Sequence, residues 1–203
     1  MPTWRKYLLD KKQRPTASFA QSDYVRRWRW VLQSPALRTL LEEYGLRMAF
    51  CPHAAVAPFA EVFDPPDYVE VIDQLTTPSL QPLFAKTALL VTDYSSVAFE
   101  LAYVDKPVVY YQFDAGQFYD GGHVGVRGYF DFATDGFGPV CKSEEDFVAC
   151  VEAAMSGYEP SHFAERRRTT FAYRDDRCCK RVYESILDLD APLQDPSGKK
   201  RRA

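Results

Sequence analysis

Five consecutive residues have the side chains that a phosphate-binding turn needs. The segment Thr92-Asp93-Tyr94-Ser95-Ser96 lies between an apolar run and a stretch with helical spacing. Ser95 or Ser96 can cap that helix, and the N–H groups of a first helical turn attract anions. Two hydroxyls beside those donors predict an anion site suited to a diphosphate. A pair of helix caps that bind no ligand is the alternative.

Two further residues could interact with phosphate groups. His53 follows Pro52 at the end of an apolar run, where its ring could donate to a phosphate oxygen or transfer a proton. Arg127 precedes Gly128 in a glycine-rich segment, and an arginine in such a loop suits phosphate clamping. A structural histidine and a solvated arginine are the alternatives at these positions.

Composition and motifs argue against several other kinds of site. No glycine-rich nucleotide-binding motif and no G-x-S-x-G elbow occurs in the sequence. The histidines His53, His123 and His162 are scattered and no Cys-x-x-Cys pair is present, so we expect no metal site. The 25 basic and 28 acidic residues give a net charge of −3, which offers no support for a nucleic-acid partner.

The elements that must position these residues alternate along the chain. Helical spacing predicts helices over 22–45 (interrupted at Pro35), 54–63, 78–86, 97–105, 143–155, 160–171 and 176–189. Apolar runs predict strands over 48–51, 68–72, 88–92 and 107–111. Ser22 and Ser143 are the expected N-caps of two of the helices, and Pro78 suits the first turn of a third.

This alternation predicts an α/β fold with a Rossmann-like, doubly wound and mostly parallel sheet. The run 88–92 shows no polar alternation, which is typical of a parallel strand covered on both faces. Such sheets bind ligands outside the carboxyl ends of their strands. Both His53 and the segment 92–96 fall at predicted carboxyl ends.

Two segments have no predicted regular structure. Residues 112–140 are long, aromatic and rich in glycine, and a stretch of that kind inside a domain is usually functional. Residues 190–203 end in Lys-Lys-Arg-Arg-Ala and predict a disordered basic tail after a domain at 1–189. The tail could contact anionic lipid, with a solvated tail as the alternative.

The sequence also favours a cytoplasmic location. No apolar run approaches the roughly 20 residues of a membrane span, and no secretory signal is visible. The five cysteines are odd in number and, without such a signal, are typical of reduced thiols.

Several segments, in this order, resemble one known family. They are Met1–Arg5, Pro52–His53, Leu90–Glu100, Lys106–Tyr111, Arg127–Phe132 and Phe163–Val182. Together they resemble the C-terminal half of the CDP-glycerol glycerophosphotransferases, the teichoic-acid primases and polymerases, over about residues 1–189. The combination of T-D-Y-S-S with R-G-Y-F-D-F at this distance is the specific part of the resemblance.

The resemblance implies the C-terminal half of a GT-B fold, in which two Rossmann-like domains face a cleft. It implies transfer of glycerol phosphate, or a related polyol phosphate, from CDP-glycerol to a hydroxyl of a polymer or lipid-linked acceptor at the inner membrane face. CDP-glycerol would be the donor substrate, with no cofactor and no metal. The implied donor-binding residues are Thr3, Arg5, His53, Thr92, Asp93, Ser95, Ser96, Arg127 and Gly128. His53 and Arg127 would also stabilise charge during transfer.

The same resemblance makes predictions about parts outside these residues. In the family, the segment matching Met1–Arg5 lies at the tip of the first strand, so the body of that strand would lie upstream. The N-terminal GT-B half, with the presumed general base, would lie there too. We therefore expect the isolated chain to be inactive and only marginally stable. Ala54, where the family usually has proline, and the glycine-rich 120–125 are departures that affect the donor loops.

Two other functions remain open from the sequence. A GT-B domain that uses a nucleotide sugar would share the architecture, because a fold does not determine the chemistry. A non-catalytic docking module would share the fold without binding a cytidine nucleotide. The aromatic content of 15% would suit such an interaction surface, although it also suits an ordinary core.

Overall fold

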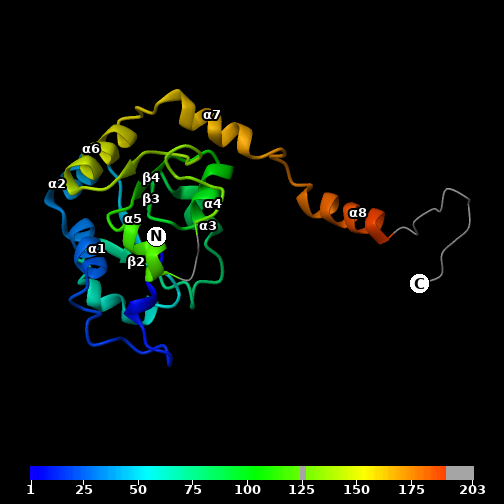
Figure 1. Ribbon diagram of the computed structural model, residues 1–203. Helices are drawn as coiled ribbons and strands as arrows, with labels where there is room; N and C mark the ends of the chain where they lie inside the picture. Colours follow the sequence, from blue (N-terminus) through cyan, green and yellow to red (C-terminus); the bar gives the residue numbers. More distant parts are fainter. Residues whose placement is uncertain (124–126, 191–203) are drawn as a thin grey trace, which may run out of the picture. The chain divides into compact units, whose positions relative to one another are not determined.

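A computed structural model describes residues 1–123 and 127–190 of the chain (Figure 1). The chain divides into two units, Met1–Thr170 and Phe171–Ala203, which are described separately. The prediction of one domain over 1–189 followed by a tail stays a prediction. The described strands of the first unit form two parallel sheets. One pairs β1 (Met48–Phe50) with β2 (Val69–Val71), and the other has the order β3 (Leu90–Thr92), β4 (Val108–Tyr111), β5 (Val140–Cys141).

Helices and single helical turns connect these strands (Figure 1). The elements of the first unit are η1 (Lys6–Leu8), α1 (Asp23–Gln33), α2 (Pro35–Glu43), η2 (Ala57–Phe63), α3 (Gln81–Lys86), α4 (Val97–Tyr103), α5 (Ala115–Gln117), η3 (Phe118–Gly122), α6 (Glu144–Met155) and α7 (Ser161–Thr170). The second unit contains α8 (Cys178–Asp190). No helix within residues 1–123 and 127–190 has both the length and the apolarity required to cross a membrane.

Local sequence explains where the longer helices begin. The Ser22 hydroxyl accepts from the Val25 N–H at 3.3 Å, and the Ser143 hydroxyl accepts from the Asp146 N–H at 3.1 Å. These bonds satisfy N–H groups that have no acceptor within a first helical turn. Pro35 begins α2 directly after α1, at a position where its missing N–H costs nothing. The predicted caps and the predicted break are confirmed.

The sheet around β4 is covered on both faces, as a doubly wound fold requires. All four residues of β4 are buried, and alternate side chains point to opposite faces. The Tyr111 ring lies 4.8 Å from Phe147 of α6 and 6.1 Å from Trp28 of α1. The Tyr110 ring instead contacts Phe132, at 5.1 Å, in the loop that precedes β5. The predicted Rossmann-like, mostly parallel α/β class is confirmed.

The element boundaries correct several predictions. The predicted helix 78–86 begins at Gln81, because the Ser79 hydroxyl accepts from the Gln81 N–H at 3.2 Å and Pro82 occupies the first turn. The predicted strand 88–92 is limited to β3, since Ala88 is exposed. The predicted helix 54–63 is a 3₁₀ segment that starts at Ala57.

The segment 112–140 is more ordered than predicted, and strand β5 was missed. The Tyr110 N–H donates to the Pro139 carbonyl at 2.9 Å, and the Gln112 N–H donates to Cys141 at 2.8 Å. Gly138 permits this pairing, because a Cβ there would lie 1.6 Å from the Val108 carbonyl oxygen. A strand of two residues has too little periodicity to be predicted from sequence.

The single expected sheet is divided in two. Among the described residues, β1 has only β2 as a strand partner, and the sheet of β3 ends at β3 itself. The first three residues of the chain lie beside the end of β3, where the Met1 amino group donates to the Val91 carbonyl at 2.7 Å. The division therefore falls between β1 and β3.

The second unit contains an amphipathic helix. Along α8 the side chains of Val182, Tyr183, Ile186 and Leu187 are at least half exposed. The predicted disordered tail lies outside the described residues, apart from residue 190, which ends α8.

Candidate functional site

Polar residues gather at the carboxyl ends of β1, β3 and β4. His53 follows β1, Asp93 follows β3, and Asp114 follows β4. Asp93 and Asp114 are linked because both accept hydrogen bonds from Arg5. The charge of Asp93 also raises the pKa of His53, although burial has the larger effect and lowers it, so Asp93 is close enough to influence the His53 ring. This is the sheet edge at which parallel α/β proteins bind ligands.

Arg5 forms the centre of this edge. Its Nε donates to Asp114 Oδ2 at 2.7 Å, and its Nη2 donates to Asp93 Oδ2 at 3.1 Å and Asp114 Oδ1 at 3.0 Å. Its Nη1 donates to the carbonyls of Thr3 and Trp4. Burial disfavours the charge, but the two carboxylates outweigh burial and raise the pKa of Arg5. Because every guanidinium N–H has an acceptor within the protein, Arg5 holds this edge together from inside.

Aromatic rings enclose the Arg5 guanidinium. Its central carbon lies 4.7 Å from the centre of the Phe118 ring and 5.1 Å from those of Tyr94 and Tyr24. The Tyr94 and Phe118 rings stack at 3.8 Å. Cations attract such ring faces most strongly when water is excluded. Arg5 therefore fixes the α5–η3 segment, which carries Phe118, against the end of β3.

Thr92 and Asp93 are fully buried, and like Arg5 they direct their polar atoms to partners within the protein. Asp93 Oδ1 accepts from the Thr3 N–H at 2.8 Å and the Tyr94 N–H at 2.6 Å. The Thr92 hydroxyl donates to the Met1 carbonyl at 2.5 Å. These predicted donor-binding residues are thus brought together, but their contacts hold the segment 1–5 rather than face solvent.

The predicted serines lie where β3 passes into α4. The Ser95 hydroxyl accepts from the Val97 N–H at 3.3 Å, which confirms the predicted cap. Ser96 occupies the N-cap position, makes no side-chain cap bond, and is exposed. Of the two hydroxyls, the one on Ser96 is the more accessible to a ligand.

Two imidazoles flank the Trp4 indole. The ring centres of His53 and His123 lie 6.3 and 5.8 Å from that of Trp4, and His123 stacks on Phe118 at 4.8 Å. Burial lowers the pKa of both histidines, and the Arg5 charge lowers that of His123 further. Burial therefore favours the neutral form of both rings.

The His53 ring has one orientation. Its Nδ1 accepts from the Ala55 N–H at 3.1 Å, so in the neutral ring the proton lies on Nε2. Nε2 is then the ring atom that can donate to an anion at the sheet edge.

Arg127 and Gly128 lie on the exposed side of the same region. The Arg127 guanidinium carbon lies 4.7 Å from the centre of the Tyr119 ring, and Tyr119 packs edge-on against Tyr94 at 5.8 Å. Gly128 is exposed, with no atom near the place of a Cβ. The glycine-rich departure 120–125 is described only up to residue 123.

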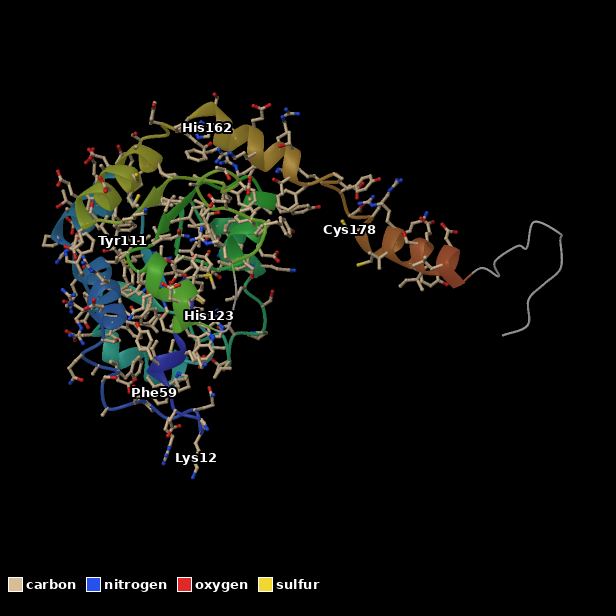
Figure 2. The ribbon with its side chains drawn as sticks, viewed as in Figure 1. Lys12, Phe59, Tyr111, His123, His162 and Cys178 are labelled. Atoms are coloured by element: carbon tan, nitrogen blue, oxygen red, sulfur yellow. The ribbon has the colours of Figure 1, made fainter. Side chains whose placement is uncertain are left out.

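Sequence reasoning missed two residues of this site. Asp114 follows a strand by the same rule that selected Asp93, and that rule would have found it. His123 had only its place in a glycine-rich loop as a signal. Figure 2 labels His123 beside the α5–η3 segment and His162 on α7, well apart from it. Within the described residues, no three His, Cys, Asp or Glu side chains are grouped so that they could hold a metal ion.

Parallel strands, helices on both faces and a polar carboxyl edge define a Rossmann-like α/β protein. Sequence comparison is more specific, since residues 1–188 match the CDP-Glycerol:Poly(glycerophosphate) glycerophosphotransferase family. The chain belongs to this family, and the resemblance drawn from its motifs is confirmed.

Curated relatives come from teichoic acid synthesis. The minor teichoic acid biosynthesis protein GgaB of Bacillus subtilis (strain 168) is 33% identical over 198 residues, which cover 94% of this chain and 21% of GgaB. The teichoic acid poly(ribitol-phosphate) polymerase of Bacillus spizizenii is 29% identical over 87 residues, covering 39% of this chain and 12% of the polymerase.

Solved structures of the wall teichoic acid polymerase TagF share the fold. One has a TM-score of 0.59 at 18% identity and covers 93% of this chain and 42% of TagF. An H444N variant of TagF soaked with CDPG has a TM-score of 0.51 at 18% identity, with coverage of 83% and 46%. The chain therefore spans about a fifth of GgaB and less than half of TagF, within a GT-B-like architecture.

Proposed function

We propose that this chain supplies the donor-binding part of a transferase that moves polyol phosphate from a CDP-polyol to a hydroxyl group. Glycerol phosphate from CDP-glycerol is the first choice, with a teichoic-acid-like polymer or lipid-linked acceptor. Family membership, the GgaB relationship and the TagF crystals soaked with CDPG support this choice. An N-terminal GT-B half would complete the enzyme, and a lipid-linked acceptor would place it at the inner membrane face.

The observation that carries the proposal is that the polar residues at the carboxyl edge of the sheets fall into two groups, one buried and one accessible. Arg5, Thr92 and Asp93 are buried. Asp93 accepts from Arg5 and from the partly buried Thr3 N–H, and the Thr92 hydroxyl donates to the Met1 carbonyl. They serve as positioning groups. Accessible polar groups then remain around them. These are the His53 Nε2–H, the Ser96 hydroxyl, the Arg127 guanidinium and the Gly128 backbone.

These accessible groups suit the charge changes of phosphoryl transfer. The acceptor oxygen would attack the phosphorus that carries the polyol and form a new bond to it. The bond between that phosphorus and the bridging oxygen would break, and the bridging oxygen would leave as part of CMP. Negative charge then grows on the bridging oxygen and on CMP. An N–H donor at His53 and a cation at Arg127 would stabilise that charge. The proton of the attacking hydroxyl would pass to a base outside this chain.

Isothermal titration of the purified chain with CDP-glycerol tests the proposal, with CMP and UDP as controls. We expect cytidine-selective binding. His53→Ala and Arg127→Ala should each lower the affinity about tenfold to a hundredfold, because a charge-assisted hydrogen bond contributes roughly 1.5–3 kcal/mol. His162→Ala is the matched control, since that ring lies on α7 against Phe163 and should not affect binding.

The other outcomes distinguish the alternatives. Unchanged affinity in both variants would contradict the site assignment. Preference for UDP-sugars would favour a nucleotide-sugar glycosyltransferase. No nucleotide binding by a chain that circular dichroism shows to be folded would favour a docking module.

A further inference from the structure

His123 lies beside the carboxyl-edge site, but it is not among the accessible groups assigned to the donor. Its N–H donates to the Phe118 carbonyl at 3.2 Å, which fixes its backbone at the end of η3. Its side chain is half-buried. Figure 2 shows it beside the α5–η3 segment, which Arg5 fixes against the end of β3. The imidazole therefore belongs to the same packed edge as Arg5.

Two aromatic rings hold the His123 imidazole in place. It stacks on Phe118, with ring centres 4.8 Å apart and planes 11° apart, and it contacts Trp4 edge-on at 5.8 Å. Phe118 is itself buried and stacks on Tyr94 at 3.8 Å. A side chain that is already ordered loses less conformational entropy when it binds a ligand. These contacts make His123 a preorganised group at the sheet edge.

Trp4 connects His123 to His53. The centre of the His53 ring lies 6.3 Å from that of Trp4. The charge of His53 lowers the pKa of His123, so the two imidazoles lie within electrostatic range of each other. They come from separate parts of the chain, since His53 follows β1 and His123 follows η3. A ligand with two anionic groups at this edge could therefore contact both rings.

The surroundings of His123 favour its neutral form until an anion binds. Burial has the largest effect and lowers its pKa, the charges of Arg5 and His53 lower it further, and the charge of Asp93 raises it. Asp93 and Asp114 already pair with Arg5, so the Arg5 charge is balanced within the protein. A phosphate beside the His123 imidazole would favour the protonated ring, which donates from both nitrogens.

We propose that His123 is a second phosphate-binding residue, which acts with His53 on the diphosphate of a CDP-polyol donor. This inference rests on the proposed function and extends it by one residue. Two donors on different elements suit a ligand with two phosphate groups, whereas CMP has only one. The alternative is a structural ring that only supports η3. The two roles differ because phosphate binding needs the ring nitrogens, whereas stacking needs only the aromatic plane.

His123→Phe separates these roles. A phenyl ring can keep the stack on Phe118 and the edge contact with Trp4, but it has no nitrogen. In isothermal titration of the purified chain, we expect the variant to bind CDP-glycerol about tenfold more weakly and CMP less than about threefold more weakly. His162→Phe makes the same change on α7 and should alter neither affinity. Melting temperatures of both variants check that the fold is retained.

Proton uptake gives a readout that a structural ring would not change. The titrations are repeated in two buffers that differ in their enthalpy of ionisation. We expect the unsubstituted chain to take up protons when CDP-glycerol binds, because the phosphates raise the lowered pKa values of both imidazoles. His123→Phe should reduce this uptake. His123→Gln, which keeps one N–H donor but cannot become charged, should reduce the uptake equally while losing less affinity.

The outcomes distinguish this inference from the proposed function. If His123→Phe leaves the affinity for CDP-glycerol unchanged while His53→Ala weakens it, the inference is wrong and the proposed function stands. Unchanged proton uptake in His123→Gln would overturn the inference in the same way, even if His123→Phe fails to fold. If the unsubstituted, folded chain binds no CDP-glycerol, both the proposed function and the inference are contradicted.

Discussion

Replacing Arg5 by methionine should destabilise the fold far more than its single charge implies. Methionine keeps most of the apolar volume, so the variant mainly removes hydrogen bonds and charge. Asp93 and Asp114 would then lie close together with no cation between them. Water could not screen their charges, because the side chain of Asp93 is fully buried and that of Asp114 is only 6% exposed. Breaking a buried ion pair on one side typically costs about 3–5 kcal/mol.

The structure allows a quantitative expectation. For a chain of this size, each kcal/mol lowers the melting temperature by roughly 2–4 °C, so a loss of about 6–20 °C is expected. Urea unfolding followed by tryptophan fluorescence would measure the free energy, with Trp4 adjacent to the change. Arg5→Lys should be intermediate, because one ammonium cannot reproduce the bonds to both carboxylates.

Two further variants make the reasoning refutable. Arg5→Met combined with Asp93→Asn and Asp114→Asn removes all three charges and should recover part of the lost stability. Arg14→Met is the matched control, since its partner Asp10 is on the surface, and it should have little effect. If Arg5→Met changes the unfolding free energy by less than about 1 kcal/mol, the range of a surface pair, the assigned role of Arg5 is wrong.

The remaining predictions concern pH and packing. Burial lowers the pKa of His53 and His123, so the unfolded chain binds protons more readily. The stability contributed by the two neutral rings should be fully present above about pH 6.5 and should be lost as the pH drops through their lowered pKa values. Urea midpoints measured against pH should show this decrease, and a variant with both His53→Gln and His123→Gln should not. Gly138→Ala should unfold at a much lower temperature, because its Cβ would meet the Val108 carbonyl at 1.6 Å. Gly116→Ala, with open space around it, should be neutral or slightly stabilising.

Much of the local structure followed from the sequence alone. The caps at Ser22 and Ser143, the break at Pro35 and the strand 107–111 all agree with the structure, because each depends on neighbours within a few residues. The boundaries of α3 and η2 were less accurate. Pro78, Ser79 and Pro82 compete to start the first turn of α3, and η2 is a 3₁₀ segment with a non-helical residue, Phe59, inside it. Family membership also followed from the sequence, through motifs whose order along the chain is specific.

The site was only partly predictable. The rule that parallel α/β sheets bind ligands at their carboxyl ends selected His53 and the segment 92–96, and the structure brings them to one edge. It did not reveal which of these residues face solvent. Arg5 and Asp93 are buried and bonded to each other, and Thr92 is buried and bonded to the Met1 carbonyl, whereas Ser96 and Arg127 are exposed.

Tertiary structure alone decided how distant parts combine. Arg5 and Asp114 are 109 residues apart, and no periodicity indicates that they meet. The pairing of β5 and the position of His123 against Trp4 likewise arise from the packing of separate elements. Sequence patterns report the environment of each element, whereas pairing between elements depends on shape and burial that exist only once the chain has folded.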